Sequence, residues 1–296
     1  MLNYYDHVRS HRELYKQFSC KEILFLLCEC PPKFSSSTDW VDYNAFSYII
    51  SGKLIVHTGE RSYLLQQGQS VFLKKGVYGI EKTNTDLFCS LLFYVPDSYL
   101  CSFFREQPTR FHDMHTAGAA TASLLPIQTD AVLQAFFHSV YSYFESNTTP
   151  AEDLIELKLK ELLLNIVTNP LNDQLRSYFY QLAFTNTNDL QEVMERNCLY
   201  NLQLHEFARL CHRSLSTFKR DFQAAYGMPP GRWLLEKRLE AAARLLVQSR
   251  QPVTDIAADS GFKHTAHFNR AFKEHFNLSP LQYRKQHTAS SLMLHD

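Results

Sequence analysis

Residues 216–233 read STFKRDFQAAYGMPPGRW, and fifty residues later residues 266–283 read AHFNRAFKEHFNLSPLQY. The two segments share aromatic residues, an arginine and a proline at the same spacing. The matching positions are Phe218, Arg220, Phe222, Pro230 and Trp233 in the first segment and Phe268, Arg270, Phe272, Pro280 and Tyr283 in the second. Such internal repetition predicts one short helical unit that is built twice.

Each copy predicts a short helix, a turn and a longer helix. Ala208 and Ala257 fall in the middle of the short helices, where a methyl group lets the next helix cross closely. Gly261 supplies the positive φ that the second turn needs. His212 stands at the same place in the first turn, where histidine is tolerated at some cost. The second turn is one residue longer, and both blocks have the features of a helix-turn-helix unit.

The phenylalanines at i and i+4 mark the buried stripe of each longer helix and leave the opposite face to solvent. These faces combine cations with small and amide side chains, the mixture that binds phosphates and base edges in the major groove. A merely solvated face would more often interleave carboxylates, whereas Asp221 and Glu274 lie off the central line. The predicted DNA-binding residues are Ser216, Thr217, Lys219, Arg220, Gln223, Thr265, Ala266, His267, Asn269, Arg270 and Lys273.

A long helix over about 232–248 is predicted between the two units. At 1.5 Å per residue it is about 25 Å long. Two units at its ends would approach the roughly 34 Å spacing of successive major grooves on one side of B-DNA. One chain would then present both arginines, Arg220 and Arg270, to two groove segments without a second subunit.

The formal net charge of zero conceals an acidic front and a basic back. Residues 201–290 carry fourteen Lys and Arg against seven Asp and Glu, a balance of +7. Residues 1–200 carry sixteen against twenty-two, a balance of −6. Basic segments of this kind usually bind phosphate or an anionic membrane surface, and an ordinary solvated surface is the alternative on charge alone.

The cysteine pattern and the apolar runs indicate a cytoplasmic protein. The seven cysteines are odd in number and irregularly spaced, and a chain of 296 residues has no need of disulfides. The longest apolar run, ILFLL at 23–27, is too short to cross a bilayer, and no basic-then-apolar leader opens the chain. We therefore expect reduced thiols, no export and no membrane partner.

The front half predicts β structure followed by helices, so that the chain as a whole is α+β. Short β-rich runs between 40 and 95, separated by glycine turns, favour a small antiparallel barrel or sandwich. Residues 131–145, 152–168 and 173–184 have helical character. The aromatic content of 14% fits bulky core filling, with an aromatic-lined ligand pocket as the alternative.

Within 152–168, four apolar residues form a narrow stripe of the coiled-coil type. They are Ile155, Leu159, Leu162 and Ile166. The stripe either packs on the core of the β domain or pairs two subunits, and the spacing alone leaves both alternatives open.

Residues 190–287 resemble the DNA-binding domain of the AraC/XylS family of bacterial transcription regulators, most strongly in DIAADSGFKHTAHFNRAFKEHFNLSPLQYRK at 255–285. The resemblance places nine of the predicted residues on the groove-facing helices of that family. They are Ser216, Thr217, Lys219, Arg220, Thr265, Ala266, His267, Asn269 and Arg270. It implies sequence-specific binding of double-stranded DNA at a promoter or operator, RNA polymerase as a second partner, and activation as the expected outcome.

Members of this family often carry an N-terminal cupin-like barrel and helices that pair two subunits, and the front half resembles that layout. The expected organisation is a cupin-like regulatory β domain (1–130), a helical dimerisation or linker region (131–185), the DNA-binding domain with two helix-turn-helix motifs (186–287) and a flexible tail (288–296). A homodimer is the expected assembly. The effector is either a small molecule or a regulatory protein, as in AraC-type activators of type III secretion genes.

The stretch GQSVFLKKGVYG at 68–79 resembles a second cupin motif without its metal ligand. Lys74 stands where proline is usual, Gly79 stands where the ligand histidine would be, and only His57 remains near the first motif. A catalytic metal needs three or four N or O ligands. We therefore expect no metal, no cofactor, no catalytic residue and no enzymatic activity.

Weaker metal signals are Cys28-Glu-Cys30, the pair His112 and His115, and the pair His264 and His267. The first lacks a second cysteine pair, and the histidine pairs are expected in a loop and at the start of a groove-facing helix. No P-loop, GxSxG or GxGxxG motif occurs. Two other functions stay as alternatives: a non-metal cupin enzyme with an appended binding domain, and an architectural protein that binds DNA through phosphates alone.

Overall fold

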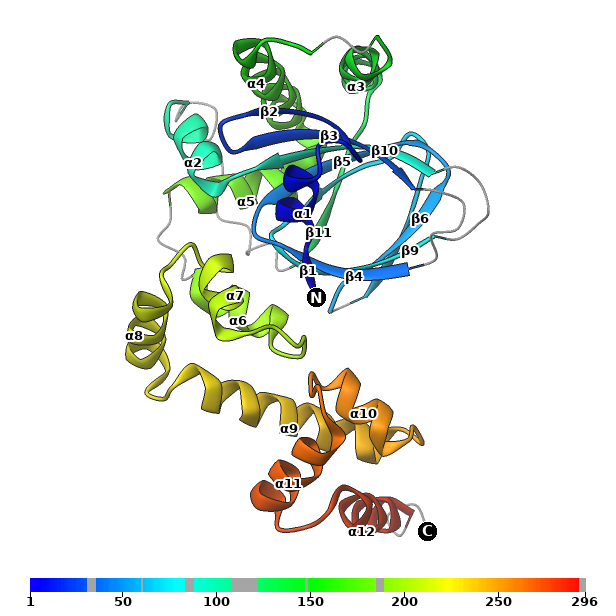
Figure 1. Cartoon of the computed structure of the whole chain (residues 1–296), viewed down its shortest axis with the longest axis vertical. Helices are drawn as coiled ribbons and strands as arrows, with labels where there is room; N and C mark the ends of the chain where they lie inside the picture. Colours follow the sequence, from blue (N-terminus) through cyan, green and yellow to red (C-terminus); the bar gives the residue numbers. More distant parts are fainter. Residues whose placement is uncertain are drawn as a thin grey trace. The chain divides into compact units, whose positions relative to one another are not determined.

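The computed structural model describes residues 1–30, 36–59, 61–82, 88–107, 122–146, 149–184 and 189–292. The chain divides into two units, Met1–Asn188 and Asp189–Asp296. The first contains all the strands that the structure describes, and the second is built from helices (Figure 1). The pair His112 and His115, predicted in a loop, lies outside the described residues.

The N-terminal unit is built on two β-sheets. The strands are β1 (Leu2–Asn3), β2 (Lys16–Cys20), β3 (Ile23–Cys30), β4 (Ser36–Val41), β5 (Asn44–Ser51), β6 (Lys53–His57), β7 (Ser62–Gln66), β8 (Ser70–Leu73), β9 (Gly76–Lys82), β10 (Phe88–Val95) and β11 (Leu124–Ile127). One sheet has the order β1-β4-β9-β6-β7 and the other β11-β8-β5-β10-β3-β2. The pairings are antiparallel except for the parallel pair β1–β4, and the sheets curve around a common interior (Figure 1).

The six-stranded sheet is buried on both faces. Along β10, Leu91 and Phe93 belong to a core formed with the helices, while Phe88 and Tyr94 belong to a second core that faces the other sheet. Because successive side chains of a strand point to opposite faces, one strand contributes to both cores. This alternation puts the inner face of β10 toward the interior between the sheets.

Five helices accompany the sheets: α1 (Tyr4–Ser10), α2 (Asp97–Arg105), α3 (Ala131–Glu145), α4 (Glu152–Thr168) and α5 (Asp173–Phe184). Aromatic rings pack α2, α3 and α5 into the outer core: Phe104 stacks on Phe179 with ring centroids 4.6 Å apart, and Tyr48 stacks on Phe137 at 4.2 Å. The core-filling interpretation of the aromatic content is therefore correct for these rings.

The apolar stripe of α4 packs on the N-terminal unit's own core. Its four residues are at most 2% exposed and belong to the cluster that joins the helices to the six-stranded sheet. They are Ile155, Leu159, Leu162 and Ile166. Of the two alternatives for this stripe, the structure shows the intramolecular one.

The C-terminal unit has seven helices in its described part. They are α6 (Asp189–Asn197), α7 (Leu204–Leu210), α8 (Leu215–Tyr226), α9 (Pro230–Gln248), α10 (Val253–Asp259), α11 (Thr265–Phe276) and α12 (Pro280–Leu292). α12 continues to Leu292 and so includes the first residues of the predicted tail at 288–296, and the flexibility of that tail stays a prediction.

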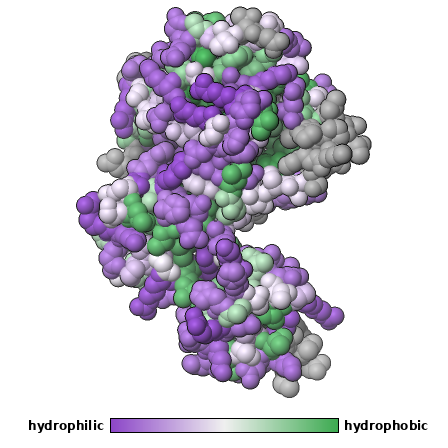
Figure 2. Space-filling model, viewed as in Figure 1, coloured by the Kyte–Doolittle hydropathy of each residue, from purple (hydrophilic) through white to green (hydrophobic). Residues whose placement is uncertain are grey.

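The surface drawn in Figure 2 is mainly hydrophilic, with apolar residues in small groups. Among the helices that the structure describes, none combines the length and the apolar character that crossing a membrane requires. Arg and Lys side chains on the helices often pair with carboxylates one turn away, as Arg232 does with Glu236 at 2.9 Å.

Candidate nucleic-acid interface

The first helix-turn-helix unit consists of α7 and α8 and is held by an aromatic cluster. Phe218 and Phe222 of α8 are fully buried. Phe222 stacks on Tyr226 at 4.3 Å between ring centroids and meets Trp233 of α9 edge-on at 5.8 Å. The i, i+4 spacing of these aromatics fixes which side of α8 faces inward.

The second unit consists of α10 and α11 and repeats this arrangement. Phe268 and Phe272 of α11 are fully buried, and Phe272 meets Tyr283 of α12 at 5.4 Å. The core of this unit also includes Leu239 and Leu246 of α9. One unit thus packs near the beginning of α9 and the other on its later turns, and α9 connects them (Figure 1).

The two turns have the same backbone hydrogen bonds. In the first, the N–H groups of His212 and Arg213 donate to Arg209 and Ala208 at 2.8 and 2.9 Å. In the second, the N–H groups of Gly261 and Phe262 donate to Ala258 and Ala257, both at 2.9 Å. His212 and Gly261 both have positive φ, 50° and 81°. Histidine at this position therefore leaves the turn geometry intact.

The structure places all eleven predicted DNA-binding residues on or beside the outward faces of α8 and α11. Nine are exposed, and Thr217 and Thr265 are half-buried at the helix starts. Lys219 of α8 corresponds to Asn269 of α11, and Gln223 corresponds to Lys273. Each face thus carries one arginine at the shared position and a different set of neighbours.

The carboxylate of Asp221 on α8, which pairs with two arginines, was not predicted as part of the site. Asp221 accepts from Arg213 Nε at 3.1 Å, and Arg220 lies beside its other oxygen, with Nη2 at 3.2 Å. The corresponding residue of α11 is Ala271, which is buried. Sequence reasoning missed this contact, because Arg213 lies in the first turn and Asp221 within α8, and they meet only when the turn closes.

α9 spans nineteen residues, Pro230–Gln248, and at 1.5 Å per residue is about 28 Å long. Pro230 occupies its first turn, where the missing N–H has no intrahelical partner to lose. Arg238 of α9 donates to the carbonyl groups of Cys198 and Tyr200 at 2.8 and 2.7 Å. These bonds tie the loop after α6 to the connecting helix.

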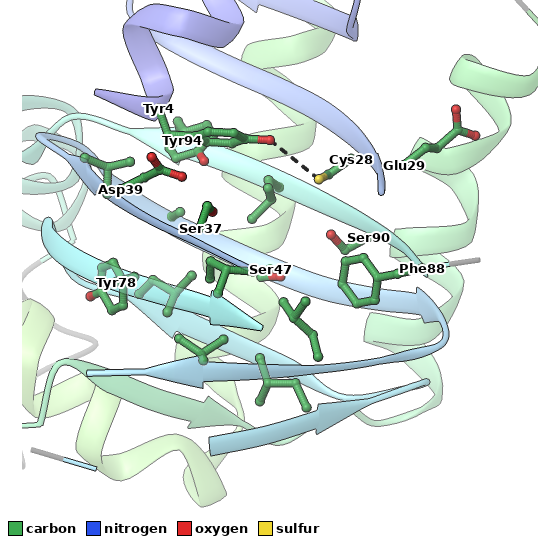
Figure 3. A pocket seen from close by; sticks show the side chains of 18 of the residues that line it. Tyr4, Cys28, Glu29, Ser37, Asp39, Ser47, Tyr78, Phe88, Ser90 and Tyr94 are labelled. Carbon is green, nitrogen blue, oxygen red and sulfur yellow. Dashed lines mark hydrogen bonds between the residues drawn. The ribbon is translucent and has the colours of Figure 1, made fainter. Parts of the chain in front are cut away.

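A second candidate site is a pocket between the two sheets of the N-terminal unit (Figure 3), with a volume of about 230 Å³. Its wall is largely apolar, with aliphatic contributions from Leu54, Val56, Leu65, Leu73, Ile80 and Leu92. The Tyr4 hydroxyl and the Cys28 Sγ, 3.6 Å apart, lie along one side. The sequence suggested such a pocket only as an alternative to core filling.

The weaker metal signals do not converge in the part of the chain that the structure describes, where no three His, Cys, Asp or Glu residues lie close enough to hold one ion. His264 precedes α11 and His267 lies on its exposed face. His57 instead bonds to Ser62 at 2.7 Å and to Glu81 at 2.9 Å on the outer surface of its sheet. The side chain of Cys30 lies outside the described residues.

Two helix-turn-helix units on one connecting helix, preceded by an antiparallel β domain, define a DNA-binding transcription regulator. Residues 44–178 match the model of the ExsA N-terminal regulatory domain, and residues 207–286 match that of a helix-turn-helix domain. The chain belongs to the AraC/XylS family of transcription regulators.

Relatives match most of the chain. VirF of Yersinia enterocolitica, a virulence regulon transcriptional activator, is 27% identical over 237 residues, which cover 80% of this chain and 87% of VirF. ExsA of Pseudomonas aeruginosa, an HTH-type transcriptional regulator, is 25% identical over 239 residues, which cover 80% and 84%. The solved structure of fatty-acid-bound ToxT from Vibrio cholerae covers 88% of this chain and 94% of ToxT at 13% identity, with a TM-score of 0.42.

Proposed function

We propose that the chain activates transcription by inserting α8 and α11 into successive major grooves of a promoter. The observation that supports this best is the repeated outward face, with Arg220 and Arg270 at matching positions on helices that pack at different ends of α9. The length of α9, about 28 Å, is close to the roughly 34 Å between successive grooves on one side of DNA. Activation is suggested by the name of VirF.

The proposal includes RNA polymerase as a partner, the cytoplasm as the compartment and a regulatory, non-enzymatic role. The N-terminal unit receives the signal, from a small molecule or from a regulatory protein. A second copy of the chain is a further proposed partner. Apolar side chains that would suit such an assembly are Leu157 on α4, 60% exposed, and Leu171 before α5, 75% exposed.

Selection of bound sequences from random DNA by the full chain tests the proposal. We expect a bipartite site whose two elements lie about 10–10.5 base pairs apart, because the grooves on one face recur at that spacing. Affinity for the selected site should fall steeply with salt, as phosphate contacts release counterions. A ratio near one between the affinities for selected and random DNA would instead support an architectural protein.

A reporter gene placed behind the selected site tests activation separately from binding. We expect transcription to rise when the chain is expressed, and to return to the basal level when Arg220 and Arg270 are both replaced by alanine. Repression by the wild-type chain would retain the DNA-binding part of the proposal and contradict the activating part. Size-exclusion chromatography with light scattering tests the homodimer.

A further inference from the structure

Three hydroxyl groups line the interior pocket of the N-terminal unit. Ser47, Ser90 and Tyr94 line the pocket and are 5%, 3% and 3% exposed. Each of these hydroxyls can donate to or accept from a molecule in the pocket. Hydroxyl groups on an otherwise apolar lining favour a bound molecule with a polar group.

The strand register brings these hydroxyls to one wall. Ser90 of β10 pairs with Cys28 of β3, and Leu92 of β10 pairs with Ser47 of β5. Tyr94 follows two residues beyond Leu92 on the same face. Burial raises the pKa of Tyr94 well above its usual value, so its hydroxyl keeps its proton and can donate.

The charges around the pocket have one sign. Asp39 and Glu29 line it, and no Lys, Arg or His side chain is among the described lining residues. Glu29 lies 3.6 Å from Lys16 at the surface. Asp39, on the inward face of β4, has no ion-pair partner among the residues that the structure describes. An anionic ligand would therefore meet a carboxylate and no counter-charge.

The shape and chemistry of the wall set the remaining properties of the ligand. Most of the lining surface is apolar, from aliphatic and aromatic side chains, which favours an apolar body. A volume of about 230 Å³ lies just below the roughly 300–1,000 Å³ of pockets for drug-sized ligands, so the molecule is small. Asp39 can only accept hydrogen bonds while ionised, so the head group has to donate.

We propose that this pocket binds a small, largely apolar molecule whose head group is a hydroxyl or an amine, and that it rejects the corresponding acid. The inference rests on the proposed control of the regulator by a small molecule and names the chemical class of that molecule. Asp39 selects the head group, and the hydroxyls of Ser47, Ser90 and Tyr94 provide further hydrogen-bonding groups along one wall. The apolar wall binds the remainder.

Three probes with the same chain length and different head groups test the proposal: 1-octanol, octylamine and octanoate, each titrated calorimetrically into the full chain. We expect 1-octanol and octylamine to bind at least ten-fold more tightly than octanoate. The alcohol and the amine distinguish a neutral donor from a charged one. Equal or tighter binding of octanoate, or no binding of any probe, would overturn the proposal.

Two variants test which residues of the pocket determine the probe affinities. Asp39→Asn should reduce the ratio of the octanol affinity to the octanoate affinity at least three-fold, because it removes the carboxylate charge and keeps the shape of the side chain. Ser90→Leu should weaken all three probes at least ten-fold by filling the pocket. Asp153→Asn, which removes an exposed carboxylate from α4 of the same unit, is the control and should leave all affinities unchanged. An unchanged ratio of the two affinities in Asp39→Asn would contradict the role of Asp39.

Binding of the selected DNA site by the same preparations separates this inference from the proposed function. If the probes fail while the DNA site is bound, the ligand class is wrong and the DNA-binding proposal stands. If the probes bind in the expected order while DNA binding fails, the pocket assignment stands and the proposed function is wrong.

Discussion

The two helix-turn-helix units share their turn hydrogen bonds and their buried phenylalanines, yet their surroundings differ. His212 in the first turn is exposed to solvent. Gly261 in the second turn is buried, and a Cβ built on it would lie 2.5 Å from the carbonyl oxygen of Leu199 and 2.9 Å from Arg238 Nε. The same backbone conformation therefore accepts a side chain in one unit and excludes it in the other.

The units also differ in charge and in capping. Asp221 of α8 contacts two arginines, whereas α11 has buried Ala271 at that position. The hydroxyl of Ser214 accepts from the N–H of Thr217 at the start of α8, whereas the His264 side chain makes no such bond at the start of α11. We infer that the second unit depends on backbone packing and the first on side-chain interactions.

The largest expected effect is that of Gly261→Ala. The added methyl group meets backbone at 2.5 Å and forces alanine into the left-handed region, so we expect a loss of about 2–4 kcal/mol in the free energy of unfolding of the C-terminal unit. Urea denaturation measures it. In a Trp40→Phe background, Trp233 is the only tryptophan and reports on this unit.

The reciprocal variant is the control for this contrast. His212→Gly relieves a positive φ at an exposed position, so we expect no loss and a gain of at most about 1 kcal/mol. Equal destabilisation by the two variants would show that the turns are not distinguished by the packing around Gly261.

The next largest effect concerns DNA affinity. Arg220→Ala and Arg270→Ala should each weaken binding to the selected site by about 1–3 kcal/mol, with the larger loss for Arg270. Because Asp221 partly neutralises Arg220 in the free protein, the contact of Arg220 with DNA should contribute less to the binding free energy. Fluorescence anisotropy with labelled DNA measures both. Arg250→Ala, an exposed arginine in the loop after α9, is the control. Unchanged affinity in both variants would exclude the groove assignment.

The sequence predicted the elements that follow from periodicity. The spacing of Phe218 and Phe222, repeated in Phe268 and Phe272, was enough to locate α8 and α11 and to choose their outward faces. Whether the residues on those faces touch DNA stays a prediction. The stripe on α4 was compatible with packing inside the chain and with pairing of two subunits, because both require the same spacing. Only the fold distinguishes the two.

The features that sequence could not supply depend on contacts between distant segments. The backbone of Leu199, which lies 62 positions earlier, crowds Gly261. From the sequence, the glycine indicated only a turn. Ser47 and Ser90 lie on one wall because β5 pairs with β10, and no local pattern places these two serines on the same wall. The Arg213–Asp221 contact likewise forms only when the turn closes.

A smaller effect should come from the N-caps. Ser214→Ala removes the hydroxyl that accepts from the Thr217 N–H, so we expect the C-terminal unit to lose about 1 kcal/mol in its free energy of unfolding. His264→Ala should change stability by less than about 0.5 kcal/mol, because no cap bond is lost. Urea denaturation followed by Trp233 fluorescence compares the two. A larger loss for His264→Ala would contradict the asymmetry in capping.

The smallest effect is that of Asp221→Asn, and it decides whether the charge difference between the units matters for DNA. Asp221 is partly exposed and Arg220 is 76% exposed, and exposed ion pairs contribute at most about 1 kcal/mol. Removing the carboxylate should therefore raise affinity for random DNA by no more than about five-fold. The gain should be smaller on the selected site, because base contacts already hold Arg220 there.

Specificity, measured as the ratio of the two affinities, should consequently fall in Asp221→Asn. Glu236→Gln is the matched control, because Glu236 pairs with Arg232 on α9 and not with a residue of α8. If both variants raise affinity for random DNA equally, the effect is one of net charge alone. If only Asp221→Asn lowers the ratio, the Asp221 carboxylate makes DNA binding by the first unit depend on a matching base. Ala271 carries no charge and cannot have this effect in the second unit.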